Sequence, residues 1–293
     1  MNGIINILKP PGMTSHQVVA FLRRVIGTRK IGHTGTLDPG AAGVLPLCIG
    51  QATRVSEYVL QMDKTYRAEL TLGTATDTED AAGQVIARKT IPPLEVEQVR
   101  KVMADFVGAR LQIPPMFSAV RVQGEKLYQR ARRGETVERQ PRPINIYTLK
   151  LLRLQPQSLL FDVSCSRGTY IRTLCCELAE ALGTVGHMSF LVRVSVGPYH
   201  LNETFTLEEC AALQAANKLA QAILPIDSAL GQLPPLIVSA ENAAKIKNGR
   251  AVKLVDLPPT GTIMRVYGPD NNFLAVARIE NNVLQPRKVF HSR

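Results

Sequence analysis

Apolar residues recur at helical spacing in several stretches of the chain. The first stretch follows Thr14 or Ser15, either of which can cap a helix, and it stops at Gly27. Thr206 and Glu209 form a capping box for another stretch. Helices are therefore predicted up to residue 26, over 95–106, from 171 to about 182, after Thr206, and after Ser239.

Alternation of apolar and polar residues marks a second kind of element. From Tyr66 to Leu72 every second residue is apolar, which predicts a half-buried strand. Further strands are predicted over 146–154, 159–165, 262–267, 273–279 and 283–290. Because helices and strands do not alternate regularly, the predicted fold class is α+β with neighbouring antiparallel strands. The loop TRKIGHTGTLDPG holds too many glycines and prolines for regular structure.

Length and composition indicate two structural units. The chain has 293 residues, more than a typical single domain, and 45 % of them are hydrophobic. An apolar, proline-marked segment near 224–235 separates the remainder of the chain. We expect a large α+β domain over 1–230 and a small β-rich domain over 231–293.

The charge balance favours a polyanionic partner. Thirty-five Lys and Arg against 24 Asp and Glu leave a net charge of +11, which points to nucleic acid, although a merely basic protein is the alternative. Residues 114–142, bounded by prolines, are rich in basic side chains, and we expect them to form an insertion outside the core. The expected RNA contacts in this insertion are Arg121, Lys126, Arg130, Arg132, Arg133 and Arg139.

Cysteine usage and the N-terminal residues bear on the compartment. The five cysteines form no CxxC pair and are interpreted as buried packing residues in a reducing cytosol, and the five histidines form no ligand set. The start MNGIINILKPPG lacks the long apolar core of a signal peptide, and no stretch approaches the ~20 apolar residues that cross a bilayer. We expect a soluble cytoplasmic protein without a metal.

Asp38 is the first candidate for chemistry. It lies in GHTGTLDPGAAGVLP, where glycines let the backbone approach a ligand and Pro39 stiffens the segment after the carboxylate. Such a loop can hold one carboxylate rigidly, although an aspartate before a proline is often only a turn residue. For His33, in the same loop, a hydrogen-bonding role is the default.

Two further segments could complete a site. KTYRAEL places Tyr66 at the start of a strand, and SRGTYIRTL places Tyr170 and Arg172 at the opening of a helix. Aromatic rings stack on extruded bases, and an arginine can hold a carboxylate ionised. A core-edge tyrosine and a solvated helix charge are the structural alternatives, and spacing alone does not separate them from a functional role.

Six ordered blocks of sequence resemble the TruB family of tRNA pseudouridine synthases. They are KPPGMTS at Lys9, GHTGTLDPGAAGVLPLCIG at Gly32, KTYRAEL at Lys64, GTATDTEDAAG at Gly73, PPMFSAVRVQGEKLYQRARRGE at Pro114 and CSRGTYIRTL at Cys165. The resemblance covers nearly all of residues 3–230, and the tail is similar to the small PUA-like RNA-binding domain of bacterial members. It implies the pseudouridine synthase fold, a central, mainly antiparallel mixed sheet flanked by helices.

The resemblance also implies roles for single residues. Asp38 would be the catalytic aspartate and Arg172 its salt-bridge partner. Tyr66 would stack on the target base, whereas Tyr170 and Leu191 would line the uracil pocket.

Other implied roles concern RNA and the active-site loop. His33 would help to fill the space that the flipped nucleotide leaves. Lys9 belongs to a motif that supports the loop, and we also count it among the RNA-binding residues. The insertion 114–142 would close over the T stem-loop of tRNA.

The implied activity is isomerisation of the uridine at position 55, in the T loop of tRNA, by a monomer that needs no cofactor and no protein partner. The reaction breaks the glycosidic C–N bond, rotates the flipped uracil and joins its C5 to the sugar. No redox step is involved, in agreement with the lack of a dinucleotide fingerprint or a Walker loop. Whether Asp38 attacks C1′ or the base, or accepts a proton, stays open, as does the choice between Tyr66 and Asp38 as acceptor of the C5 proton.

Two alternatives are weighed against this reading. An RNA-binding or tRNA-folding chaperone without essential catalysis would need only the basic insertion and the tail. Relatives guided by RNA and protein partners keep the chemistry but act on another RNA, and they carry long basic extensions that this chain lacks. The sequence also departs from the family pattern at Phe117, where tyrosine is common, and at Val192 and Ser195, where arginines are frequent.

Overall fold

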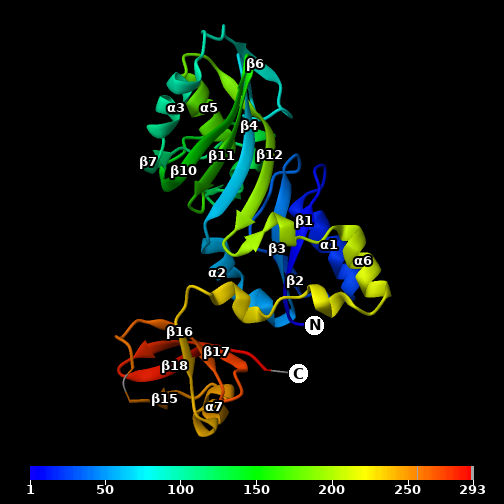
Figure 1. Ribbon diagram of the computed structural model, residues 1–293, viewed down its shortest axis with the longest axis vertical. Coiled ribbons are helices and arrows are strands. Elements are labelled where there is room, and N and C mark those ends of the chain that lie inside the picture. The colour runs from blue at the N-terminus through cyan, green and yellow to red at the C-terminus, as the bar shows by residue number, and fades with distance from the viewer. Residues whose placement is uncertain (256, 292–293) are drawn as a thin grey trace.

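The computed structural model describes residues 1–255 and 257–291, which form two sheets with helices packed against them (Figure 1). The large sheet has nine strands and comes first in the chain. The smaller, five-stranded sheet is formed by residues after 234. No helix in the described part of the chain is long and apolar enough to cross a membrane.

The large sheet is mixed but mainly antiparallel, which confirms the predicted fold class. Its order is β1 (Gly3–Lys9), β3 (Ala42–Ile49), β12 (Gly186–Val196), β4 (Lys64–Leu72), β11 (Ser158–Cys165), β10 (Arg142–Gln155) and β7 (Gly108–Gln112). β2 (Ile31–His33) pairs with β3, and β13 (Tyr199–His200) pairs with β12. The parallel neighbours are β3 and β12, joined by only two residue pairs, Ala42 with Val192 and Gly43 with Arg193.

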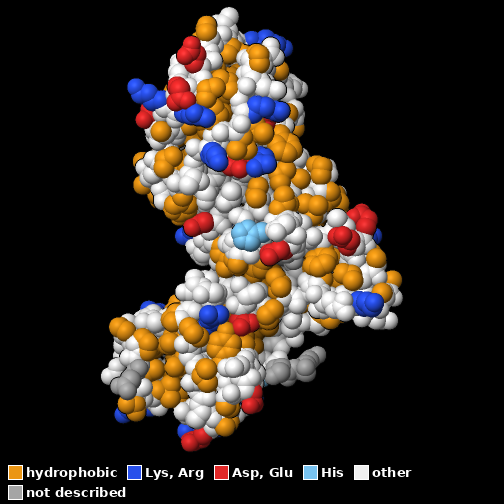
Figure 2. Space-filling model, viewed as in Figure 1, with side chains coloured by type: hydrophobic (Ala, Val, Ile, Leu, Met, Phe, Trp, Pro, Cys, Tyr) orange, Lys and Arg blue, Asp and Glu red, His pale blue; other side chains and the backbone are white. Residues whose placement is uncertain are grey.

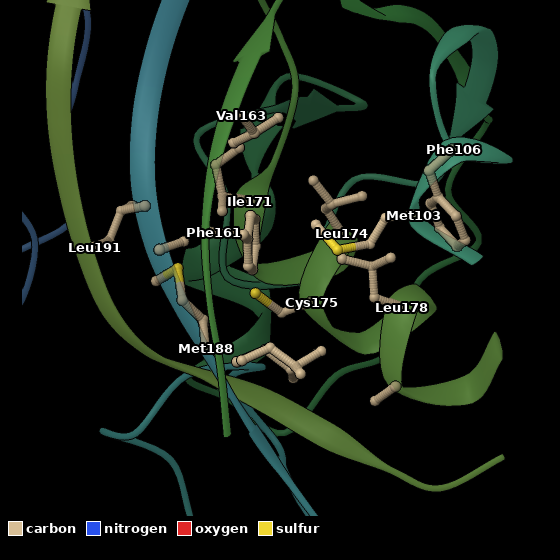
Figure 3. Packing of buried hydrophobic residues seen from close by; sticks show 14 of the residues in the cluster. Met103, Phe106, Phe161, Val163, Ile171, Leu174, Cys175, Leu178, Met188 and Leu191 are labelled. Carbon is tan, nitrogen blue, oxygen red and sulfur yellow. The ribbon is translucent and has the colours of Figure 1, made fainter. Parts of the chain in front are cut away.

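Helices α3 (Val96–Ala104) and α5 (Ile171–Ala181) cover one end of this sheet. Leu174, Cys175 and Leu178 of α5 pack with Met103 of α3 and Phe161 of β11 in a buried cluster (Figure 3). The alternation in β4 and β11 follows from this arrangement, because only one face of these strands meets the helices.

A second cluster lies where the chain begins. Helices α1 (Ser15–Ile26) and α6 (Leu207–Ala215) pack on β1, β2 and β3. The predicted capping box of Thr206 and Glu209 is present, and Gly27 ends α1 in the left-handed conformation. Short helical segments follow β3 and β13, namely η1 (Gly50–Val55), α2 (Ser56–Gln61), η2 (Leu201–Glu203), η3 (Leu219–Ala222) and η4 (Ile226–Leu230).

The smaller sheet has its own core and rests against the first unit. Its order is β14 (Pro235–Ile237), β16 (Ile263–Tyr267), β17 (Phe273–Glu280), β18 (Val283–Val289) and β15 (Val252–Lys253), with α7 (Ala240–Lys247) alongside. Lys288 forms an ion pair with Glu57, and the Arg54 guanidinium lies over the Phe290 ring, so polar contacts and stacking join the two units.

Residues 113–141 connect two neighbouring strands of the large sheet. Gln112 at the end of β7 pairs with Arg142 at the start of β10, so this segment leaves the sheet and returns at the same place. It contains the hairpin β8 (Arg121–Val122) and β9 (Glu125–Lys126) and the short helix α4 (Leu127–Ala131). A second hairpin, β5 (Thr74–Thr76) with β6 (Val85–Arg88), follows β4.

One local expectation was wrong. The segment TRKIGHTGTLDPG was expected to be irregular throughout, but Ile31–His33 form strand β2. Its partner β3 is almost fully buried, and pairing with it satisfies backbone groups that would otherwise lie unpaired beside the core.

Close backbone packing at Gly43 gives a test of the contact between β3 and β12. Gly43 has φ +111°, and a Cβ there would lie 2.3 Å from the Arg193 carbonyl oxygen. Gly43→Ala should therefore lower the free energy of unfolding by roughly 2 to 5 kcal/mol in denaturant titrations. Gly32→Ala is the matched control, because a Cβ at Gly32 meets nothing within 4 Å. Equal stability of the two variants would contradict the close approach.

Candidate active site

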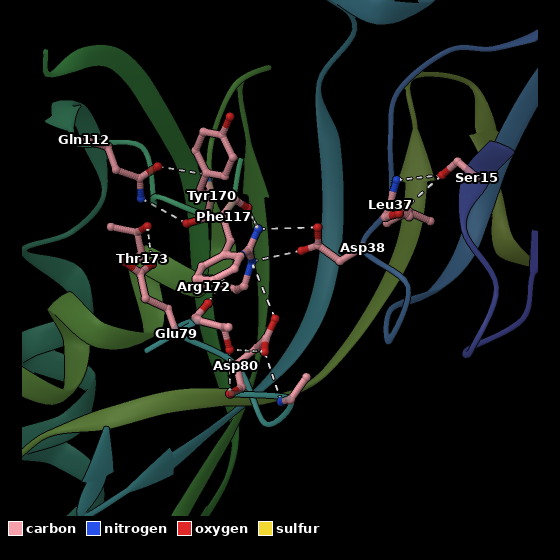
Figure 4. A network of polar contacts seen from close by, with 12 residues as sticks. Ser15, Leu37, Asp38, Glu79, Asp80, Gln112, Phe117, Tyr170, Arg172 and Thr173 are labelled. Atoms are coloured by element: carbon pink, nitrogen blue, oxygen red, sulfur yellow. Dashed lines mark hydrogen bonds and ion pairs between the residues drawn. The ribbon is translucent and has the colours of Figure 1, made fainter. Parts of the chain in front are cut away.

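Asp38 lies on a loop between β2 and β3 that is anchored at several points. The Leu37 amide donates to the Ser15 hydroxyl at 3.0 Å (Figure 4). The Thr34 hydroxyl donates to the Pro46 carbonyl at 2.9 Å, and the Ala41 amide donates to the Asp38 carbonyl at 3.1 Å. These contacts tie both arms of the loop to the sheet and to α1, so the carboxylate sits on a held backbone.

Lys9 holds the same loop through hydrogen bonds to backbone carbonyls. Its side chain is fully buried, and its amine donates to the carbonyls of Pro10 at 2.9 Å, Pro39 at 3.2 Å and Ala41 at 2.6 Å. Three acceptors use all three donors of an ammonium group. The expectation that Lys9 contacts RNA is therefore corrected, because the amine has neither exposure nor a free donor; its place agrees with support of the loop.

Arg172 binds the Asp38 carboxylate from the second residue of α5. Arg172 Nε lies 3.0 Å from Asp38 Oδ2, and Nη2 lies 3.4 Å from Oδ1. Nη1 donates to the Thr78 carbonyl at 3.1 Å. Nη2 also donates to the Phe117 carbonyl at 2.8 Å (Figure 4). The Arg172 side chain is 5 % exposed and that of Asp38 37 %. A buried cation thus holds a carboxylate whose other side is open to a ligand.

Two acidic residues near this pair were not among the predicted site residues. Asp80 Oδ2 lies 4.0 Å from Arg172 Nε, while its Oδ1 accepts from the Thr78 hydroxyl at 2.6 Å. Glu79 accepts from the Thr173 hydroxyl at 2.7 Å, and burial raises the pKa of Glu79. The block GTATDTEDAAG supplies both, but nothing in its spacing indicates that this loop reaches Arg172.

Tyr66 and Leu191 belong to the apolar cluster on which the Asp38 loop rests. Leu37 and Ala41 of that loop are in the same cluster as Leu191, and Tyr66 packs against it. Burial raises the pKa of the Tyr66 phenol, an effect that the positive charge of Arg193 opposes. Apolar side chains therefore lie next to the loop that carries Asp38.

Tyr170 is the residue that precedes α5. Its amide donates to Gln112 Oε1 at 2.8 Å, and Gln112 Nε2 donates back to the Tyr170 carbonyl at 3.0 Å (Figure 4). This pair of bonds fixes the entry to α5 against the end of β7. Burial raises the pKa of Tyr170, so its hydroxyl is a neutral donor near neutral pH.

His33 lies at the end of β2, where the loop begins. Its ring meets that of His16 edge to face at 5.3 Å between centroids. Burial lowers the pKa of His33, and His16 and Arg193 add to this effect. The imidazole is therefore neutral near neutral pH. The structure does not pair it with Asp38.

The basic side chains of the insertion are already engaged. Arg133 pairs with Glu125 at 2.6 Å and with Glu135 at 2.7 Å, and Arg130 pairs with Glu125 at 3.2 Å. Arg139 donates to the Pro114 carbonyl at 3.1 Å. In the absence of RNA, these arginines therefore contact other residues of the insertion.

The other predicted RNA contacts of the insertion also have partners nearby. Arg121 donates to the Gly124 carbonyl at 3.1 Å, and Lys126 and Arg132 lie by the Tyr128 ring. On the face shown in Figure 2, Lys and Arg side chains are interspersed with Asp and Glu. The positive net charge is thus not gathered in one patch on that face.

The arrangement suits a reaction that needs one ionised carboxylate beside an apolar surface. A guanidinium fixes the orientation of the carboxylate and compensates its charge. Within residues 1–255 and 257–291, no group of three or more His, Cys, Asp or Glu is placed to hold a metal ion. Four cysteines are buried, and burial raises the pKa of each, as expected of packing residues: Cys48, Cys165, Cys175 and Cys210.

Three family models match successive parts of the chain. "TruB family pseudouridylate synthase (N terminal domain)" matches residues 23–171 and "tRNA pseudouridylate synthase B C-terminal domain" residues 172–231. "Pseudouridine synthase II TruB, C-terminal" matches residues 234–290. The matches together cover most of the chain.

Similar proteins and structures point the same way. A protein named tRNA pseudouridine synthase B from Caldanaerobacter subterraneus subsp. tengcongensis is 39 % identical, with 99 % of each chain covered. One of the same name from Dehalococcoides mccartyi is 41 % identical, covering 100 % of this chain and 97 % of the other. A chain in the crystal structure of a Cbf5-Nop10-Gar1 complex is 26 % identical with a TM-score of 0.77, covering 99 % of this chain and 85 % of that one.

Burial of Lys9 predicts a pH dependence of stability. Burial lowers the pKa of Lys9 to about 8 from its ordinary 10.5, although Asp38 partly opposes the shift. Between these values the unfolded chain binds more protons than the folded protein, so the stability that Lys9 confers rises with pH. Below about 8 this gain is absent.

The measurement compares the parent with Lys9→Met by denaturant unfolding on either side of this pH window. The free energy of unfolding of the parent should increase relative to the variant as pH rises. Lys30→Met, which removes the same charge from an exposed position, is the control. A free energy of unfolding of the parent that stays constant or falls relative to that of Lys9→Met as pH rises would contradict the lowered pKa of Lys9.

Proposed function

The chain belongs to the TruB family of pseudouridylate synthases, which are isomerases, and from this premise we propose that it converts the uridine at position 55, in the T loop of tRNA, to pseudouridine. The observation that carries the proposal is the pairing of a half-open Asp38 carboxylate with the buried Arg172 guanidinium. The relatives named tRNA pseudouridine synthase B match nearly the whole chain, which supports tRNA as the substrate.

The reaction needs a site that stabilises a detached uracil without releasing it. The glycosidic N1–C1′ bond breaks, the base rotates and C5 bonds to C1′. C5 then loses its proton while N1 gains one, so no atoms are gained or lost overall. Asp38 acts as nucleophile or as proton acceptor, and both roles require the ionised carboxylate that Arg172 holds in place. Neither role requires a cofactor.

Access to a uridine inside a folded T loop requires base flipping. Extruding a base costs a few kcal/mol, which contacts in the pocket must offset. In this proposal the Tyr66 ring stacks on the uracil, while Leu191 and Tyr170 line the pocket. Stacking on an aromatic ring contributes about 1 to 3 kcal/mol per base, which is comparable to the cost. His33, neutral and close to the loop, would occupy the space that the base vacates.

The proposal includes where and with what the protein acts. It acts on tRNA in the cytoplasm as a monomer without a protein partner. Relatives named tRNA pseudouridine synthase B align with nearly the whole chain, and Asp38 and Arg172 pair within this one chain. The similar structure from a Cbf5-Nop10-Gar1 complex shares the fold. The partners named in that complex belong to it and are not part of this proposal.

The carboxylate itself provides the first test. Asp38→Asn keeps the size of the side chain but removes its charge, so turnover should fall by about 10,000-fold or more. RNA affinity should be nearly unchanged, because many contacts to phosphate contribute to it. Pseudouridine at position 55 is measured by chemical mapping of tRNA after single-turnover incubation, and binding by filter retention.

Asp162→Asn is the matched control for this change. Asp162 also pairs with an arginine, Arg67 at 2.8 Å, but on the outer face of the large sheet. It should convert tRNA at the rate of the parent. If Asp38→Asn did the same, the activity would not depend on the carboxylate, and a chaperone that binds and folds tRNA would become the better description.

The ion pairs inside the insertion provide a second test, which concerns binding. Glu125→Gln with Glu135→Gln should free Arg133 and Arg130 for phosphate. Exposed ion pairs are weak, so losing them should cost little, and the freed arginines should tighten tRNA binding several-fold. The logarithm of the binding constant should also fall more steeply with salt concentration.

A double variant with the same change of net charge separates the insertion from general attraction. Glu97→Gln with Glu208→Gln removes two exposed carboxylates elsewhere on the large unit. Equal tightening by both double variants would mean that only net charge matters. No tightening by Glu125→Gln with Glu135→Gln would show that the insertion arginines do not meet RNA.

A further inference from the structure

Arg193 is a buried arginine in the middle of the large sheet, on β12. Its side chain is 1 % exposed. Nε donates to the Val44 carbonyl at 2.7 Å, and Nη2 donates to the Gly35 carbonyl at 3.2 Å. These hydrogen bonds go to backbone carbonyls and not to a carboxylate, which is an uncommon way to bury a full positive charge.

The partners of Arg193 lie on both sides of the catalytic loop. Gly35 is three residues before Asp38, and Val44 is in β3, just after the loop. In the sheet, Arg193 itself is paired with Gly43 of β3 and with Tyr66 of β4. Arg193 therefore lies at the junction of the Asp38 loop with the sheet, beside Tyr66.

The cost of burying this charge argues for a specific use. Removing an ion from water costs several kcal/mol, and an apolar side chain of similar volume fills such a space more favourably. Two carbonyl acceptors compensate the cost only in part. The position beside Tyr66 and the Asp38 loop is what distinguishes this arginine from one that only fills the core.

We propose that Arg193 is a positioning residue for the isomerisation, whose guanidinium fixes the Gly35 carbonyl, and with it the Asp38 loop, against the Tyr66 ring on which the uracil stacks. This inference rests on the proposed function of Asp38 and Tyr66. Arg193 touches neither the RNA nor the reacting atoms; it acts through the two residues that do.

Electrostatics agree with this geometry. Burial raises the pKa of Tyr66, and the charge of Arg193 opposes this shift. Burial lowers the pKa of Arg193, and the Tyr66 phenol opposes that shift. The same charge contributes to the lowered pKa of Lys9 on the other side of the loop. Lys9, Arg172 and Arg193 therefore surround the Asp38 loop with three cations.

The inference predicts an effect on turnover and not on binding. Without the guanidinium the Gly35 carbonyl loses its donor, and the loop can shift relative to Tyr66. A displacement of about 1 Å at a reacting group costs on the order of 100-fold in rate. Affinity for tRNA is expected to rest on many contacts to phosphate away from Arg193, so the dissociation constant should change little.

The test compares Arg193→Met, Arg193→Lys and the control Arg67→Met, each in the full-length protein. Arg67 lies on the neighbouring strand β4 but is exposed, with its guanidinium paired to Asp162. Arg193→Met should reduce the single-turnover rate at saturating tRNA about 100-fold, with the dissociation constant within about threefold of the parent. Arg193→Lys, which restores the charge and one donor, should recover part of the rate. Arg67→Met should match the parent.

The possible outcomes separate this inference from the proposed function. If the parent itself formed no pseudouridine in tRNA, the proposed function would fail. If the parent were active and folded Arg193→Met turned over at a similar rate, or were restored by raising the tRNA concentration, Arg193 would have no positioning role. Should Arg193→Met not fold, Arg193→Lys decides, and a parent-like rate at saturating tRNA overturns the inference.

Discussion

A buried guanidinium needs acceptors for its N–H donors, and Arg172 finds acceptors in three separate segments of the chain. It binds the Asp38 carboxylate from the loop between β2 and β3, the Thr78 carbonyl from the loop after β5, and the Phe117 carbonyl from the insertion. None of these segments is ordered by a sheet or helix at the point of contact. One cation at the start of α5 therefore joins all three segments at the candidate active site.

The Asp38 loop is held mainly through its backbone, which explains how it keeps a carboxylate exposed without letting it move. Lys9 and Arg193 bind carbonyls of the loop and its flanks, and Ser15 binds the Leu37 amide. Contacts to the backbone leave the Asp38 side chain free to meet a ligand. Each buried cation costs desolvation energy, and a purely apolar support would avoid that cost but could not accept or donate hydrogen bonds to the loop.

Much of the fold could be predicted from the sequence, but the tertiary contacts of the site could not. Strands β4 and β11 were predictable because one face of each is buried, which makes apolar and polar residues alternate. β1 and β3 are buried on both faces, so their apolar residues run on without a period and gave no strand signal. The resemblance implied the pair of Asp38 and Arg172, which the structure contains. Arg193 gave no signal, because its burial follows from sheet register, which no local pattern reveals.

The insertion is held mainly by ion pairs between side chains, whereas the Asp38 loop is held mainly through its backbone. Its arginines make exposed ion pairs with Glu125 and Glu135, which are weak and easily exchanged for phosphate, whereas its base at Phe117 is bound by the buried Arg172. The departure from tyrosine at Phe117 leaves that bond unaffected, because the acceptor is the backbone carbonyl. A segment that is loosely held at its tip and firmly held at its base can reorganise on RNA while its anchor stays in place. Because that anchor shares a guanidinium with Asp38, a displacement of the base of the insertion would disturb the carboxylate as well.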